Sequence, residues 1–135
     1  MIAVDTNILV RFLVCDDQQQ AEAARTLLES LTAEQPGFIC REVTLELVWV
    51  LERAYNFSRH RIANIVEELV STEGLVFESQ DDVARSAIRY RTVSAGFSDL
   101  MISSAAKRAG AHLLYTFDKK AARLERVTLL ATGTI

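Results

Sequence analysis

The amino-acid sequence predicts an α/β fold, in which short parallel strands alternate with helices around one hydrophobic core. Short apolar runs of strand length recur along the chain, and segments with apolar residues at helical spacing separate them. The chain has 135 residues, and 50% of them are apolar, which supports one core and leaves little room for a second. Since no repeat, linker or low-complexity segment divides the sequence, we expect a single domain over residues 1–135.

Five short apolar runs predict the strands. Each is only three or four residues long, which is typical of short strands buried in a parallel sheet. In chain order, the expected strands are residues 2–4, 38–40, 75–77, 113–115 and 127–130.

Six segments between these runs predict helices. In four of them apolar residues repeat at helical spacing. Residues 8–14 read as a short, mostly buried helix, and residues 99–109 lie between a candidate cap and a terminating glycine. The expected helices are residues 8–14, 18–32, 42–56, 80–92 and 99–109, with another between Ser58 and Gly74. Helix starts are indicated by the Asp5-Thr6-Asn7 triplet, Ser58 and Ser98, whose side chains can cap a first turn.

Charge is distributed unevenly along the chain. Residues 1–84 carry 6 basic and 15 acidic side chains, whereas residues 85–135 carry 9 basic and 3 acidic ones. The formal net charge of -3 therefore hides a basic C-terminal part, which is typical of a surface that faces a polyanion. A solvated surface without a partner would give the same pattern, so charge alone leaves both interpretations open.

The cysteines and the hydropathy pattern indicate the compartment. Cys15 and Cys40 lack the close spacing of a disulfide framework or a zinc site. The sequence has no apolar run long enough to cross a membrane, and its N-terminus lacks the basic start and small-residue exit of a signal peptide. We therefore expect a cytoplasmic protein with reduced thiols and no membrane partner.

Acidic residues from four separate elements are expected near the carboxyl ends of the strands, where open α/β folds place their sites. They are Asp5, Glu46, Asp99 and Asp118. Converging carboxylates repel one another unless a cation lies between them, and oxygen ligands favour Mg²⁺ or Mn²⁺. Because such a metal can activate water and neutralise a phosphoryl oxygen, the pattern predicts phosphodiester hydrolysis.

Each of these acidic residues also has a structural interpretation. Asp5 and Asp118 could cap the turns that follow them, and Asp99 would be favoured in a first helical turn by the helix dipole. Glu46 could pair with Arg53 or face the solvent. The metal hypothesis therefore depends on the joint placement of the four residues.

Four segments of the sequence, with the acidic residues named above, form a recognisable set: IAVDTNILVRFL, VTLELVWVLERAY, GFSDLMISSAAKRAG and LLYTFDKKAARL. Together with the domain length, they resemble the PIN-domain ribonucleases over nearly the whole chain, and most closely the VapC toxins of bacterial toxin–antitoxin pairs. The resemblance implies a three-layer fold, in which helices flank a parallel sheet of four to five strands in the order 3-2-1-4-5.

The resemblance also implies the metal ligands. Asp5, in DTN, matches the first metal-binding aspartate, and Glu46, in TLELVWVL, matches the glutamate of the family. Asp99, in FSDLMI, and Asp118, in TFD, match the third and fourth acidic positions. The polar neighbours that would orient ligands and waters are Thr6, Asn7, Ser98 and Thr116.

Two positions qualify this match. Glu42 lies one helical turn before Glu46 and competes with it for the second acidic position. Gly96 stands where many relatives carry a further aspartate, although Asp99 is retained.

Together, the residues and the resemblance predict an Mg²⁺- or Mn²⁺-dependent endoribonuclease that acts as the toxin of a toxin–antitoxin pair. A metal-activated water would hydrolyse a phosphodiester of tRNA or ribosomal RNA, while the basic C-terminal part holds the RNA backbone. The candidate RNA-binding residues are Lys107, Arg108, Lys119, Lys120 and Arg123, with Arg85, Arg89 and Arg91 as further cations. The implied partners are RNA, a cognate antitoxin that blocks the acidic site, and a second copy in a homodimer.

Other functions stay open at this point. A PIN nuclease could act in RNA processing without being a toxin, and a scaffold could bind partners without catalysis. An aspartyl-phosphate phosphatase would also place an aspartate after the first strand, but it needs a second one where this chain has Asn7. Trp49, on the same helical stripe as Glu46, could stack on a base, contact a partner or belong to the core.

Overall fold

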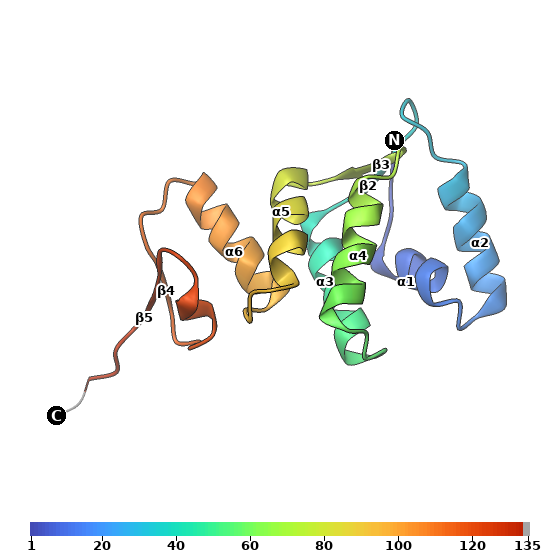
Figure 1. Ribbon diagram of the computed structural model, residues 1–135. Coiled ribbons are helices and arrows are strands. Elements are labelled where there is room, and N and C mark those ends of the chain that lie inside the picture. The colour runs from blue at the N-terminus through green and yellow to red at the C-terminus, as the bar shows by residue number, and fades with distance from the viewer. Residues whose placement is uncertain (134–135) are drawn as a thin grey trace.

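The computed structural model describes residues 1–133 and has the alternating strands and helices of an α/β fold (Figure 1). The expected single domain includes residues 134 and 135, which lie outside the described residues. The strands are β1 (Ile2–Ala3), β2 (Gly37–Ile39), β3 (Leu75–Phe77), β4 (Leu114–Thr116) and β5 (Val127–Leu129). The helices are α1 (Thr6–Val14), α2 (Gln18–Glu29), α3 (Arg41–Arg53), α4 (Arg59–Val70), α5 (Gln80–Tyr90) and α6 (Phe97–Arg108), with a 3₁₀ turn η1 (Ala121–Arg123).

The strands form two separate parallel sheets. In the first, β1 pairs with β2 and β2 with β3, so that Phe38 lies opposite Ala3 on one side and Val76 on the other. In the second, β4 pairs with β5 alone, and Tyr115 lies opposite Thr128. The expected neighbours 3-2-1 are confirmed, but the continuation of that sheet through β4 and β5 is wrong for this structure. Helices α5 and α6 lie between the two sheets (Figure 1), which keeps β4 away from β1.

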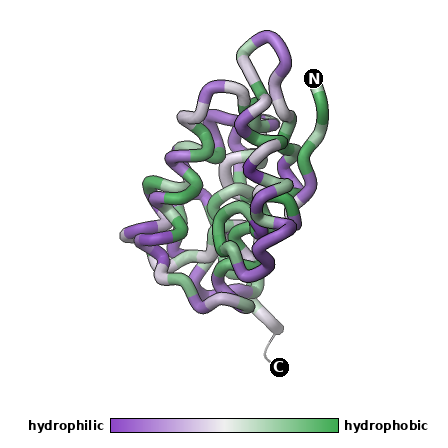
Figure 2. The backbone as a smooth tube through the Cα atoms, turned by 90° about the vertical axis from the view of Figure 1, so that its right-hand side faces the viewer, coloured by the Kyte–Doolittle hydropathy of each residue, from purple (hydrophilic) through white to green (hydrophobic). Residues whose placement is uncertain are grey.

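The core lies where the three-stranded sheet meets the apolar faces of the helices. Its fully buried side chains come from α1, α3, α4, α5, α6 and β2, and they include Leu9, Leu51, Ile62 and Leu100. Figure 2 shows hydrophobic residues gathered in the interior of the coil and hydrophilic ones along its outer turns. Within residues 1–133, no helix combines the length and the apolar character that crossing a membrane requires.

Side-chain caps define the starts of α1, α2 and α4, and those of α1 and α4 were expected from the sequence. The Asp5 carboxylate accepts a hydrogen bond from the Thr6 amide at 2.7 Å, and the Ser58 hydroxyl accepts one from the Arg61 amide at 3.1 Å, as the sequence predicts. The expected cap at Ser98 is wrong. Helix α6 begins two residues earlier than expected, at Phe97, and its N-cap is Gly96, so Ser98 lies inside the first turn.

One arginine fixes the segment that leads into α6. Arg59 donates hydrogen bonds to the carbonyl oxygens of Tyr90, Val93 and Ala95 at 2.6–2.9 Å, and its guanidinium lies 3.8 Å from the centre of the Tyr90 ring. The Tyr90 hydroxyl in turn donates to Glu52 at 2.7 Å. Burial, reinforced by this hydrogen bond, raises the pKa of Tyr90. This cluster sets the position from which α6, and with it Asp99, starts.

Candidate functional site

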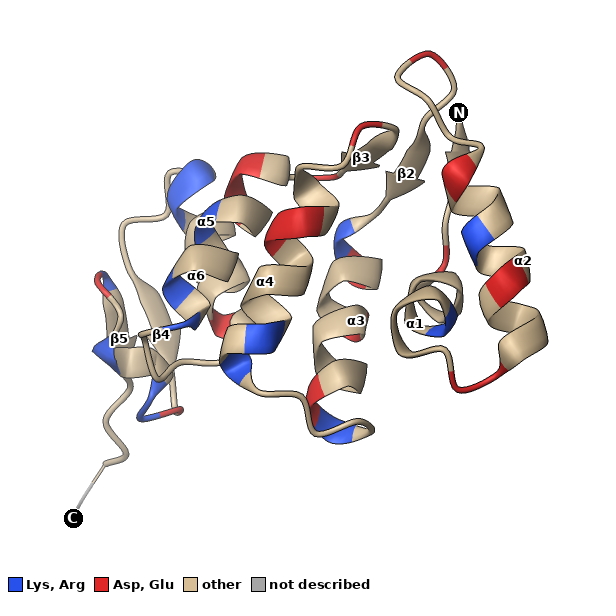
Figure 3. Cartoon of the chain, turned by 45° about the vertical axis from the view of Figure 1, so that its right-hand side comes forward, with Lys and Arg blue, Asp and Glu red and all other residues tan. Residues whose placement is uncertain are grey.

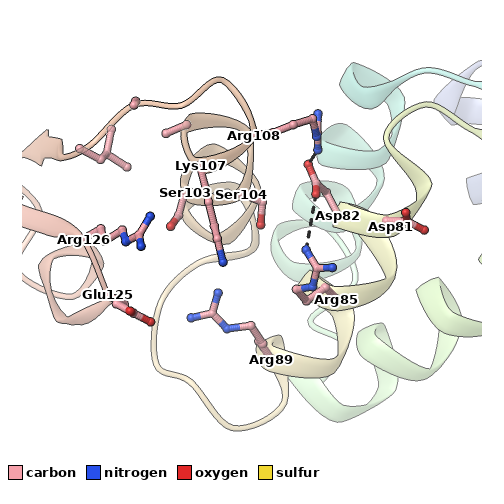
Figure 4. A pocket seen from close by; sticks show the side chains of 13 residues that line it. Asp81, Asp82, Arg85, Arg89, Ser103, Ser104, Lys107, Arg108, Glu125 and Arg126 are labelled. Carbon is pink, nitrogen blue, oxygen red and sulfur yellow. Dashed lines mark ion pairs between the residues drawn. The ribbon is translucent and has the colours of Figure 1, made fainter.

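A large open cleft lies between α5, α6 and the segment Leu114–Leu129, which we call the β4–β5 unit (Figure 4). Its volume is about 850 Å³. Basic and hydroxyl side chains from all three elements line it: Arg85, Arg89, Ser103, Ser104, Lys107, Arg108 and Arg126. The acidic residues in its wall are Asp81, Asp82 and Glu125.

The basic side chains of this cleft are only partly neutralised. Asp82, 5% exposed, forms ion pairs with Arg108 and, at 3.9 Å, with Arg85. Arg89, Lys107 and Arg126 form no ion pair with any of residues 1–133. Figure 4 shows the ends of Arg89 and Lys107 directed into the same space. Since converging cations repel one another, the cleft is suited to an anionic ligand.

The predicted RNA-binding residues are divided between this cleft and a separate turn. Lys107 and Arg108 line the cleft, whereas Lys119, Lys120 and Arg123 are exposed around η1 and do not line it. Arg91 is engaged elsewhere, because it donates to Glu67 and thereby holds the pKa of that carboxyl below its usual range.

Arg126 is a lining residue that sequence reasoning missed. It has a positive φ of 64° just before β5, where its side chain turns toward α6. A signal was available, because it continues the run of basic residues in the C-terminal part of the chain. Figure 3 shows Lys and Arg over α5, α6 and the β4–β5 unit, with acidic residues among them at the start of α5.

Two of the predicted acidic residues, Asp5 and Asp118, cap local turns. Asp5 follows β1 and caps α1, as described above. Asp118 follows β4 and accepts hydrogen bonds from the amides of Lys120 and Ala121 at 2.8 and 2.9 Å. Both side chains are exposed, and because their strands belong to separate sheets the two carboxylates do not meet within this chain.

The remaining acidic residues lie on α3 and α6. Asp99 lines a pocket of about 140 Å³ together with Thr116 of β4, so the structure brings these two predicted residues together. Glu42 lines another cavity, of about 510 Å³, between α3 and α6, while Glu46 is exposed on α3 and lines neither. A Cβ atom on Gly96 would lie 3.2 Å from Asp99 Oδ2, so the carboxylate folds closely over this glycine.

The polar residues beside these acids differ in their environment. Asn7 and Ser98 are exposed, and the Thr116 hydroxyl accepts a hydrogen bond from the Asp118 amide at 3.0 Å. Thr6 is buried, and its Oγ1 has no hydrogen-bond partner among the residues that the structure describes. An orphaned hydroxyl next to Asp5 indicates that a polar contact is missing at the carboxyl end of β1.

A divalent cation does not fit the acidic residues as they are arranged here. Nowhere in residues 1–133 do three or more His, Cys, Asp or Glu side chains lie close enough to hold one. Mg²⁺ and Mn²⁺ need several oxygen ligands at short range, and here the four carboxylates point from separate places. The arrangement therefore supports no catalytic step at a metal ion within this chain.

Trp49 is not part of the core. Its side chain is 58% exposed on the outer face of α3, beside the likewise exposed Glu46. Contact with a partner and stacking on a base both stay open for this residue.

Comparison with known proteins agrees with the sequence motifs. The family model described as PIN domain matches residues 2–127. A VapC ribonuclease of Aquifex aeolicus (strain VF5) is 26% identical over 125 residues, which cover 92% of this chain and 92% of that protein. Since the family model extends over almost the whole chain, the protein belongs to the PIN domain family.

Proposed function

We propose that this protein is an endoribonuclease that acts as the toxin of a toxin–antitoxin pair. The observation that carries the proposal is the cleft, in which three cations without ion-pair partners in residues 1–133 converge beside α6. The similarity to a VapC ribonuclease over 92% of both chains supports RNA as the substrate. Hydrolysis of an RNA phosphodiester is a reaction that uses both features, because a basic cleft binds the RNA backbone and carboxylates at strand ends can hold a metal ion.

In this proposal the cleft holds the RNA backbone. Arg89, Lys107 and Arg126 each contact a phosphate, since none of them has an acidic partner to displace among the described residues. Arg108 contributes less, because its charge is already balanced by the buried Asp82. Such contacts position an RNA without reading its bases, so the cleft does not specify tRNA or ribosomal RNA.

The proposed cofactor is Mg²⁺ or Mn²⁺, and the proposed ligands are Asp5, Glu46, Asp99 and Asp118. Support comes from the chemistry of the four carboxylates and from their match to the acidic positions of the family. Thr6, Asn7, Ser98 and Thr116 are the proposed supporting positions. Because these residues do not assemble within one chain here, the cofactor stays a prediction.

The proposed partners follow from the same assignment. A cognate antitoxin would occupy the acidic site with a basic residue, and the protein would act in the cytoplasm as a homodimer. The similarity to a VapC ribonuclease supports the antitoxin.

The experiment that tests this function measures binding and cleavage of a structured RNA by the purified protein. We expect cleavage with Mg²⁺ or Mn²⁺ and none with EDTA. Replacing Arg89 or Lys107 by glutamine should weaken RNA binding and reduce the slope of log K against log [salt] by about 0.7 for each phosphate contact that is lost.

The matched control for these cleft variants is Arg25→Gln. Arg25 is exposed on α2, without an ion pair to residues 1–133. Helix α2 lies on the opposite side of the molecule from α6 and the β4–β5 unit (Figure 1). If Arg25→Gln lost as much RNA affinity as Arg89→Gln, the proposal that the cleft binds RNA would be contradicted. If the purified protein cleaved no RNA with any metal, the proposed nuclease function would be contradicted.

A further inference from the structure

The edge of β1 that faces away from β2 has no strand beside it among residues 1–133. The amides of Ile2 and Val4 donate to the carbonyl oxygens of Pro36 and Phe38 at 3.0 and 2.9 Å, so these two residues face β2. Because backbone groups alternate along a strand, the N–H and C=O of Ala3 point to the opposite side. They are available to a further strand.

The edge of β4 that faces away from β5 has the same property. The Leu114 amide donates to the Arg126 carbonyl at 2.9 Å, and the Thr116 carbonyl accepts from the Leu130 amide at 2.8 Å. The residue between them, Tyr115, therefore directs its backbone groups away from β5. Both free edges belong to parallel sheets, so each can accept the other as a parallel neighbour.

Both edges also expose apolar side chains. Ile2 is 42% exposed, Tyr115 is 58% exposed, and Phe117, next to the end of β4, is 67% exposed. Figure 2 shows the hydrophobic N-terminal segment at the margin of the molecule. An unpaired strand edge with exposed apolar residues is a template for pairing with another chain.

Within one chain the two edges are separated by packed helices. Helix α6 is held against α5 and α3 through buried residues such as Leu100 and Met101, and Figures 1 and 3 show α5 and α6 between the N-terminal strand and the β4–β5 unit. The unit is joined to the end of α6 by the exposed residues 109–113, which include Gly110 with a φ of 81°. A second copy can reach the β1 edge without any unpacking of α6.

Charge favours the same association. The N-terminal part, residues 1–84, carries nine more acidic than basic residues. The β4–β5 unit carries Lys119, Lys120, Arg123 and Arg126 against Asp118 and Glu125. The unit of one copy is thus electrostatically complementary to the N-terminal part of another.

We propose that two copies exchange their β4–β5 units, so that β4 of each copy pairs in parallel with β1 of the other. The exchange is reciprocal and closes as a two-fold dimer, which leaves neither edge open. It also produces, across two chains, a sheet with β1 and β4 as neighbours.

The hydrogen-bond pattern limits the register of this pairing. In a parallel ladder, Ala3 bonds to the residues before and after the one that lies opposite it. On β4 the residues that face the free edge are Leu113, Tyr115 and Phe117, so Ala3 lies opposite Leu114 or Thr116. Asp5 then lies opposite Thr116 or Asp118. Either register brings Asp5 of one copy next to the end of β4 in the other.

The exchange explains why the acidic residues are scattered within one chain. Asp99 shares a pocket with Thr116 of its own chain and stays with Asp118, whereas Asp5 and Glu46 belong to the body that receives the unit. Each site would combine Asp5 and Glu46 of one copy with Asp99 and Asp118 of the other. This composition of the site rests on the proposed nuclease function, whereas the exchange of strands does not.

The first test is physical and needs no activity. Tyr115→Pro removes an amide from the free edge of β4, while Leu129→Pro removes one from the outer edge of β5, which faces away from β4. Light scattering should give a dimer for the parent and for Leu129→Pro, and a monomer for Tyr115→Pro. A monomeric parent, or equal masses for the two proline variants, would overturn the exchange.

The second test is complementation between inactive variants. Asp5→Asn and Asp118→Asn keep their capping oxygens, so both should fold. When the two are unfolded together and refolded in equal amounts, half of the dimers are mixed, and each mixed dimer has one site without a substitution. We expect about a quarter of the parent cleavage rate. The matched mixture of Asp99→Asn with Asp118→Asn should restore no cleavage, because each site takes both of these carboxylates from the same copy.

The outcomes separate the two proposals. An active parent whose Asp5→Asn and Asp118→Asn mixture stays inactive would show that both residues act within one chain, and would overturn the exchange. A parent that is dimeric in the first test but inactive with every metal would overturn the nuclease function and leave the exchange supported.

Discussion

Asp5→Asn is expected to lower the rate of RNA cleavage by about 100- to 1,000-fold, which corresponds to the several kcal/mol that a metal site contributes. The fold should be retained, because asparagine keeps the side-chain oxygen that accepts from the Thr6 amide. Only the negative charge at the carboxyl end of β1 is lost. The measurement is the cleavage rate with Mn²⁺, together with the free energy of unfolding in urea.

The matched control is Asp17→Asn. Asp17 is also an exposed N-cap, and it accepts a hydrogen bond from the Gln20 amide at 3.0 Å at the start of α2. The substitution makes the same chemical change at an equivalent position outside the proposed site. Cleavage by Asp17→Asn should equal that of the parent, and equal cleavage by Asp5→Asn would remove Asp5 from the site.

Arg59→Met is expected to cause the largest loss of stability, about 2–4 kcal/mol in the free energy of unfolding. The substitution keeps most of the aliphatic length but leaves the carbonyl oxygens of Tyr90, Val93 and Ala95 without their donor. It also removes the cation over the Tyr90 ring. Because these contacts fix the approach to α6, cleavage should fall as well.

The control for this prediction is Arg61→Met in the same helix. Arg61 is exposed, and its guanidinium lies 3.7 Å from the centre of the Phe57 ring, a contact that contributes less than about 1 kcal/mol. The measurement is the free energy of unfolding of both variants in urea. If the two variants lost equal stability, the contacts of Arg59 with residues 90–95 would not stabilise the fold.

Local structure could be predicted from the sequence because local residues determine it. Asp5 and Ser58 cap helices through amides only one to three residues away, and the apolar run 75–77 coincides with β3. The prediction of a cap at Ser98 was wrong because Gly96, in an extended conformation, starts α6 without any side-chain cap. Short-range chemistry indicates that a helix starts, but only to within a residue or two.

The pairing of β4 could not be predicted in this way. An apolar run such as residues 113–115 indicates a strand but does not say which edge the strand joins. With three residues in each of β4 and β5, the ladder contributes few hydrogen bonds, so the packing of α6 on α5 and the connection 109–113 decide where β4 lies. The family order 3-2-1-4-5 assumes pairing with β1 of the same chain, which this structure does not have.

The residue types of the candidate site could be predicted from the sequence, but whether these residues come together could not. The carboxylates follow strands as expected, but strand ends meet only when the strands share a sheet, and β1 and β4 do not. Similarly, the basic residues of the C-terminal part were apparent as a group. Only the structure distinguishes Arg126, which lines the cleft, from Lys119 and Lys120, which do not.

The most direct test of the account is a calorimetric titration of Mn²⁺ into the parent protein and its Tyr115→Pro and Leu129→Pro variants. If two copies complete each acidic site, the dimeric parent and Leu129→Pro should bind Mn²⁺ alike. The monomeric Tyr115→Pro variant should bind it at least about tenfold more weakly. A Tyr115→Pro monomer that binds Mn²⁺ as tightly as the parent would contradict the account, because one chain would then hold the complete site.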